Sequence, residues 1–156
     1  MRVFAVSDIH VDYAENLDWI LSLDAREFSE DVLILAGDVT DKMPLLRQVF
    51  DSLVACFKAV LFVPGNHELW VQDEDFDCSL TKFDAITELC KFCGVHADIF
   101  EMPDISFVPL FSWYDFSFGE PDRYLRRAWR DFRACSWPDH LSGARDVSDY
   151  FLNLNL

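Results

Sequence analysis

Three short runs rich in β-branched and aromatic residues constrain the fold of this chain most. They span Val3–Ser7, Val32–Ala36 and Ala59–Val63, and each ends at a polar or glycine-containing turn. Apolar runs of this length, bounded in this way, predict buried strands. Between them, apolar residues recur at helical spacing over Asn16–Leu23 and Met43–Cys56. Strands that alternate with helices predict right-handed crossovers and an α/β fold with a mainly parallel sheet.

The second half of the chain departs from this alternation. Ser79–Phe92 predicts a third helix, with Ser79 as its N-cap and Gly94 just beyond its end. Three short extended pieces broken by proline then predict edge or hairpin strands. These pieces are Asp98–Phe100, Ser106–Val108 and Leu110–Trp113. Pro121–Arg133 predicts a helix, and Cys135–Leu156 has no periodicity that predicts an element.

Composition indicates one globular domain over residues 1–156, with 51% hydrophobic residues. A formal net charge of −15 disfavours nucleic acid and anionic membrane surfaces as partners. The cysteine count of 5 is odd, and the first residues do not form a signal-peptide pattern. No apolar run approaches the roughly 18 residues of a spanning helix. We therefore expect no membrane segment and an intracellular, cytoplasmic protein with reduced thiols.

Residues of metal-ligand type follow all three predicted strands. Asp8 and His10 follow the first strand, Asp38 follows the second, and Asn66 and His67 follow the third. Because the carboxyl ends of parallel strands face one crevice, these side chains should converge there. Carboxylate, imidazole and amide oxygen together suit zinc, manganese or ferrous iron. A carboxylate can bridge two cations, and Asp38 is the expected bridge.

The motifs Asp-x-His, Gly-Asp-x-x-Asp and Gly-Asn-His-Glu, in this order, resemble those of the calcineurin-like metallophosphoesterase family. The resemblance implies an α/β/β/α sandwich, two divalent metal ions (manganese, iron or zinc) and hydrolysis of a phosphorylated substrate by metal-activated water. It implies that Asp8 and His10 hold the first ion, Asp38 bridges and Asn66 holds the second. His67 would act on the substrate as a general acid or transition-state stabiliser. Substrate-binding residues and the substrate itself stay open.

The sequence departs from this family after the third motif. The family pattern continues with a lone histidine and then Gly-His-x-His, and neither follows here. We expect His96 and His140 not to replace these ligands. The chain is therefore expected to be the N-terminal portion of the family domain, with an incomplete second sheet and low activity. The alternative is a non-catalytic protein-interaction scaffold with the same fold.

Weaker patterns predict structural roles. Cys90 and Cys93 have CxxC spacing without a second pair, which favours core thiols over a zinc or redox site. Four arginines recur along the predicted helix over Pro121–Arg133, which is typical of a solvated or ion-paired face, with anionic-substrate contact as the alternative. They are Arg123, Arg126, Arg130 and Arg133. The acidic run Asp73–Asp75, together with Asp77, predicts an exposed loop.

Overall fold

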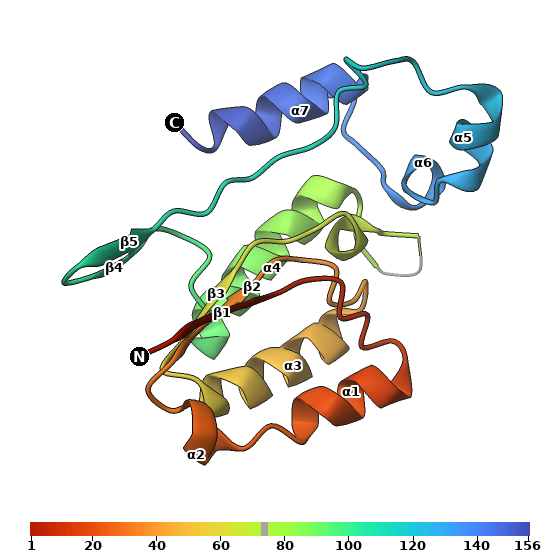
Figure 1. Ribbon diagram of the computed structural model, residues 1–156. Helices are drawn as coiled ribbons and strands as arrows, with labels where there is room; N and C mark the ends of the chain where they lie inside the picture. The colour runs from red at the N-terminus through yellow and green to blue at the C-terminus, as the bar shows by residue number, and fades with distance from the viewer. Residues whose placement is uncertain (73–74) are drawn as a thin grey trace.

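The computed structural model describes residues 1–72 and 75–156 (Figure 1). Of the predicted acidic loop, Asp73 and Glu74 lie outside the described residues, and Asp75 and Asp77 are exposed. Within the described residues, strands β1, β2 and β3 form a parallel sheet in that order, and β4 and β5 form an antiparallel hairpin. The strands are β1 (Val3–Val6), β2 (Val32–Leu35), β3 (Ala59–Phe62), β4 (Phe100–Met102) and β5 (Ile105–Phe107). The helices are α1 (Ala14–Leu21), α2 (Ala25–Phe28), α3 (Met43–Cys56), the 3₁₀ turn η1 (His67–Leu69), α4 (Ser79–Cys93), α5 (Arg123–Ala128), α6 (Asp131–Ala134) and α7 (Ala144–Asn153).

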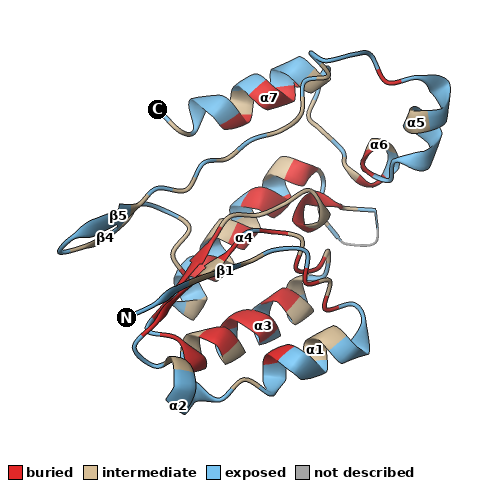
Figure 2. Cartoon of the chain, viewed as in Figure 1, coloured by how far each residue is buried: buried red, intermediate tan, exposed pale blue. Residues whose placement is uncertain are grey.

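The predicted α/β alternation and parallel sheet are confirmed. Each strand begins where the sequence pattern begins and ends one residue earlier, and α3 matches its predicted bounds. One side of β2 and β3 packs on the layer formed by α1, α3 and α4, and the other side faces the β4–β5 hairpin. Because both sides are covered, these strands are buried almost throughout (Figure 2). This burial explains why their sequences are continuous apolar runs.

The second layer is small, as the predicted incomplete second sheet requires. Only β4 and β5 pair among the described residues beyond the first sheet. Leu110–Trp113 does not form the expected strand. The side chain of Asn155 instead takes both backbone hydrogen bonds of Phe111, at 2.8 Å each. A side chain from the end of the chain therefore replaces the strand partner that this segment would need.

The predicted single helix over Pro121–Arg133 is wrong. Trp129 has an extended backbone with ψ of 121°, which separates α5 from α6. The indole N–H of Trp129 donates to the carboxylate of Asp131, a buried residue that apolar periodicity does not reveal. The four arginines therefore do not share one continuous helical face. Cys135–Leu156, which predicted no element, contains α7, packed through Val147 and Phe151.

Two smaller expectations concern the ends and thiols of α4. Gly94 ends the helix at φ of 77°, as predicted, whereas Cys78 rather than Ser79 is the N-cap. All five cysteines are free, and burial raises the pKa of the Cys90 thiol to about 12. Cys90 is therefore a core residue.

Within the described residues, no helix is long and apolar enough to cross a membrane.

A buried carboxylate fixes the loops at the carboxyl ends of the sheet. Glu68 is 1% exposed and accepts four backbone N–H groups. Asp38, Val39 and Thr40 donate at 3.0, 2.6 and 3.1 Å. Gly65 donates at 2.7 Å. The loops after β2 and β3 are thus tied together by one side chain, and burial raises the pKa of Glu68 while these donors oppose the rise.

Two glycines allow the same loops to approach closely. Gly37 has φ of +76°, and a Cβ atom there would overlap the backbone of Gly65. A Cβ atom on Gly65 would in turn overlap the carboxylate and backbone of Asp38. Glycine is therefore required at both positions for backbone proximity, and at Gly37 for its left-handed conformation as well.

We predict that Glu68→Gln destabilises the fold. The glutamine amide has one acceptor oxygen and a donor NH₂, so at least one buried backbone N–H loses its partner, at a cost of about 1–3 kcal/mol each. Thermal unfolding should show a lower Tm, by roughly 2–4 °C per kcal/mol for a chain of this size. Glu88→Gln is the matched control because the Glu88 side chain is 72% exposed. Equal Tm values for the two variants would contradict this account.

Candidate functional site

The segments that follow β1 and β2 stay paired beyond the strands. The N–H groups of Asp8 and His10 donate to the carbonyls of Gly37 and Asp38, both at 3.1 Å. Val11 continues the pairing by donating to Val39 at 2.8 Å. The side-chain amide of Asn16, in α1, also donates to the carbonyl of His10 at 3.2 Å. The parallel register therefore brings His10 beside Asp38.

Three of the predicted metal ligands have a left-handed backbone. Asp8, His10 and Asp38 have φ of 55°, 47° and 54°. Non-glycine residues in this region cost of the order of 1–3 kcal/mol each and cluster at functional sites. Local sequence gives no sign of this strain, since it results from the pairing between the two loops. Among the described residues, the one other non-glycine residue with this backbone is Phe116, so three of these four residues are candidate ligands.

Three side chains converge at this end of the sheet. Ligand atoms of His10, Asp38 and His67 all lie within 4.8 Å of one another. Within residues 1–72 and 75–156, no other group of three or more His, Cys, Asp or Glu residues comes this close. The backbone N–H of His67 donates to Asp38 Oδ1 at 3.2 Å. The structure therefore contains a candidate metal site with two imidazoles and one carboxylate.

His67 lies between two other rings. Its centroid is 4.5 Å from that of His10 and 3.7 Å from that of Trp70. Burial lowers the pKa of His67, the charge of Asp38 opposes this shift, and His10 adds to it. The net effect is a pKa of His67 below that of an ordinary histidine.

Asp8 and Asn66, the other predicted ligands, border this group. The carboxylate of Asp8 is exposed and accepts from the Ser7 hydroxyl, and it is not one of the three converging groups. Asn66 precedes η1 and donates through its amide nitrogen to Asp131 at 2.8 Å. Sequence reasoning did not identify Asp131, because a buried aspartate in a short helix has no pattern that distinguishes it from a surface aspartate.

The two remaining histidines lie outside the converging group. His96 pairs with β3 through its backbone, donating to Val60 and accepting from Phe62, and its ring contacts Phe100 at 4.3 Å. His140 is exposed in the turn before α7. In this structure neither contributes to the candidate metal site.

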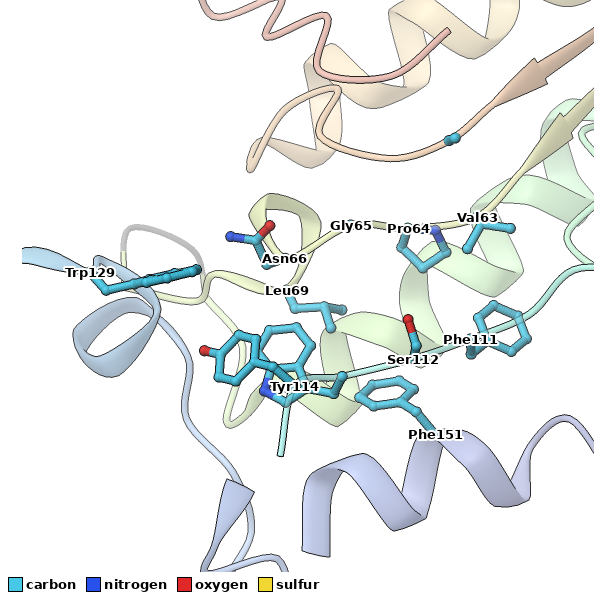
Figure 3. Close-up of a pocket in the computed structure, with 12 residues that line it drawn as sticks. Val63, Pro64, Gly65, Asn66, Leu69, Phe111, Ser112, Tyr114, Trp129 and Phe151 are labelled. Carbon is cyan, nitrogen blue, oxygen red and sulfur yellow. The ribbon is translucent and has the colours of Figure 1, made fainter. Parts of the chain in front are cut away.

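Two cavities adjoin the site. A polar cavity of about 370 Å³ has His10, His67, Lys42 and Arg130 in its wall. Arg130 lies 4.3 Å from the Trp70 ring and 3.7 Å from Asp41, so this arginine of the predicted stripe reaches the site. An aromatic cavity of about 520 Å³ has Asn66 in its wall (Figure 3). Its aromatic lining residues are Phe111, Trp113, Tyr114, Trp129 and Phe151.

The donor set is chemically suited to divalent transition metals. Imidazole nitrogen suits zinc and iron, while carboxylate and amide oxygens suit manganese. Asp38 lies between the segment that carries His10 and the segment that carries Asn66 and His67, which is where a bridging carboxylate is needed. The residues present therefore fit one or two divalent ions at the carboxyl end of the sheet.

Comparison with known proteins agrees with this geometry. The curated relative "[Acyl-carrier-protein] phosphodiesterase PptH" of Mycobacterium tuberculosis (strain ATCC 25618 / H37Rv) is 32% identical over 125 residues, which cover 74% of this chain and 38% of the relative. The crystal structure of Phosphopantetheinyl Hydrolase (PptH) from Mycobacterium tuberculosis superposes with a TM-score of 0.66 at 27% identity. That match covers 89% of this chain and 54% of the solved chain.

The chain therefore spans less than half of this curated relative and about half of this solved chain. Residues 1–150 also match the family described as Calcineurin-like phosphoesterase. With the convergence of His10, Asp38 and His67, the parallel sheet and this match in agreement, the chain belongs to the calcineurin-like phosphoesterase family.

Proposed function

We propose that this chain carries the metal-binding part of a hydrolase that cleaves phosphoesters with two divalent ions. The observation that carries the proposal is the convergence of His10, Asp38 and His67 at the carboxyl ends of three parallel strands. Membership of the family supports it. Divalent ions bound here would neutralise the phosphate and lower the pKa of a bound water. The ions are manganese, iron or zinc, the metals suited to these donors.

The proposed ligand assignment follows the order of the strands. Asp8 and His10 hold the first ion, Asp38 contributes to both, and Asn66 contributes its amide oxygen to the second. The exposed carboxylate of Asp8 can turn toward His10 without disturbing a buried contact. His67, whose backbone N–H donates to Asp38 Oδ1, would use its imidazole to act on the phosphoryl group or the leaving oxygen.

The polar cavity is the proposed place for the phosphorylated substrate. It is lined by His10 and His67 and by two cations, Lys42 and Arg130. Lys42 lies 3.9 Å from Asp12 and Arg130 lies 3.7 Å from Asp41, so both cations are held near the site by carboxylates. Guanidinium and ammonium groups bind phosphate oxygens through charge-assisted hydrogen bonds. These two side chains would therefore orient the substrate.

For the substrate class we propose a phosphodiester that joins a phosphopantetheinyl group to a carrier protein. The name of the Mycobacterium relative supports this choice. The net charge of −15 makes nucleic acid the less favourable substrate. The single-domain interpretation of residues 1–156 and the cytoplasmic location stay predictions, and five free thiols are consistent with that location.

We predict that Asp38 matters more for metal content than Asn66. Asp38→Asn keeps a residue that tolerates the left-handed backbone but replaces a charged bridging ligand, so both ions should be weakened. Asn66→Ala removes a ligand from the second ion only. Metal analysis after equilibration with Mn²⁺ should therefore give less bound metal for Asp38→Asn than for Asn66→Ala.

Asp104→Asn, in the exposed turn between β4 and β5, is the control and should bind metal as the unmodified chain does. The assignment would be wrong if Asp38→Asn kept the full metal content while Asn66→Ala lost metal. Absence of metal from the unmodified chain would instead favour the non-catalytic scaffold.

A second prediction separates His67 from the ligands. If His67 acts on the substrate, His67→Ala should lower kcat by roughly 10²–10⁴-fold, the usual contribution of a general acid. Metal content should stay unchanged. The rate is measured on a form of the protein that hydrolyses an aryl phosphodiester, and the metal is measured on the same preparation.

His140→Ala is the matched control because His140 is exposed and outside the converging group. It should change neither rate nor metal content. Loss of metal in His67→Ala in proportion to the loss of rate would make His67 a ligand rather than a group that acts on the substrate.

A third prediction concerns the activity of these 156 residues alone. Asp38 and Asn66 leave most of the coordination of the second ion to water, so this ion should exchange readily and catalysis should be slow. Titration with Mn²⁺ while hydrolysis of bis(p-nitrophenyl) phosphate and of a phosphopantetheinyl carrier protein is followed will measure this. Rapid turnover with two tightly bound ions would show that His96, His140 or a second copy supplies further ligands.

A further inference from the structure

Asp131 is a buried carboxylate outside the family motifs. Asp131 is 2% exposed. Both of its carboxylate oxygens accept hydrogen bonds. Oδ1 accepts from the amide nitrogen of Asn66 at 2.8 Å and from the indole N–H of Trp70 at 2.6 Å. Oδ2 accepts from the hydroxyl of Tyr114 at 3.1 Å and from the indole N–H of Trp129 at 2.9 Å.

These four donors come from separate parts of the fold and are uncharged. A buried charge is costly unless it is hydrogen-bonded, and hydrogen bonds to a carboxylate are stronger than those between neutral groups. Burial and the charge of Asp131 both raise the pKa of Tyr114, which keeps the phenol protonated as a donor. The carboxylate therefore fixes the side chains around it, and only one of them, Asn66, is a candidate ligand.

The contact with Asp131 fixes which way the amide of Asn66 faces. An asparagine amide has one oxygen and one NH₂ on opposite sides. Turning it over would place two oxygens against each other at the 2.8 Å contact. In Figure 3 the amide nitrogen of Asn66 points toward the segment that carries Trp129, and the oxygen lies on the opposite side. The oxygen is thus directed away from Asp131 and left available to a metal ion.

We propose that Asp131 is a positioning residue for the second metal ion, because it holds the amide oxygen of Asn66 toward that ion. The inference rests on the proposed function, since it assumes that Asn66 is a ligand. Asp131 also holds Trp70, whose ring lies 3.7 Å from that of His67. One buried carboxylate thus orients a ligand of the second ion and the ring that packs on the proposed acid.

The first test compares Mn²⁺ binding isotherms of the 156-residue chain and its variants. Asp131→Leu removes every acceptor while keeping the volume, and it should weaken the second Mn²⁺ roughly 10–100-fold, as loss of a group that orients a ligand does. The first Mn²⁺ should keep its affinity. Asp131→Asn keeps one acceptor oxygen for Asn66 and should restore most of the binding.

Two further variants make this comparison specific. Adding Asp131→Leu to Asn66→Ala should weaken the second Mn²⁺ no further than Asn66→Ala alone, because Asp131 acts through Asn66. Tyr114→Phe removes a donor to Oδ2 without touching Asn66 and should leave the second Mn²⁺ unchanged. Wild-type binding by Asp131→Leu, or equal weakening of both ions, would overturn the proposal.

The second test needs no substitution and no metal, so it decides the contact even if Asp131→Leu does not fold. In the chain labelled with ¹⁵N-asparagine, the side-chain NH₂ of Asn66 should exchange with solvent more slowly than that of exposed Asn153. Equal exchange rates would overturn the proposed role of Asp131. Slow exchange at Asn66 together with no Mn²⁺ binding by the unmodified chain would instead locate the failure in the proposed function.

Discussion

The site depends on one buried carboxylate whose two oxygens both accept backbone N–H groups. Glu68 accepts four backbone N–H groups from the loops after β2 and β3 and so fixes the distance between Asp38 and His67. The close approach requires glycine at positions 37 and 65. It is accompanied by left-handed backbone at three predicted ligands, which the surrounding pairing sustains. The fourth residue of the Gly-Asn-His-Glu motif is thus structural, while His67 belongs to the converging group and Asn66 donates to Asp131.

Much of the first half could be predicted because its sheet is covered on both sides. Continuous apolar runs locate β2 and β3 closely, and helical spacing locates α3 to the residue. The elements of the second half are harder to predict from the sequence because they depend on contacts between side chains that are distant along the chain. Asn155 replaces a strand partner at Phe111, and Trp129 breaks a helix to reach Asp131. Neither contact has a periodic signature in the sequence.

In the candidate site, too, some residues could be predicted from the sequence and others could not. Motif order was enough to identify His10, Asp38 and His67, which converge within 4.8 Å. The residues that orient them could not be identified, since Asp131 lies 65 positions from Asn66 and becomes significant only when α6 packs beside η1. Two buried carboxylates therefore contact residues around the proposed metal centre: Glu68 contacts the loops after β2 and β3, and Asp131 contacts Asn66. Glu68 sets the distance between the two loops, and the proposed role of Asp131 is to set the direction of the Asn66 amide.

The most direct test of a metal centre at this end of the sheet is anomalous diffraction at the manganese edge from crystals of the chain grown with Mn²⁺. The account predicts one anomalous peak within coordination distance of Asp8, His10 and Asp38. It predicts a second, weaker peak between Asp38 and the amide oxygen of Asn66, with His67 beside the pair and bound to neither. Manganese bound elsewhere, or no peak beside Asp38, would contradict the account.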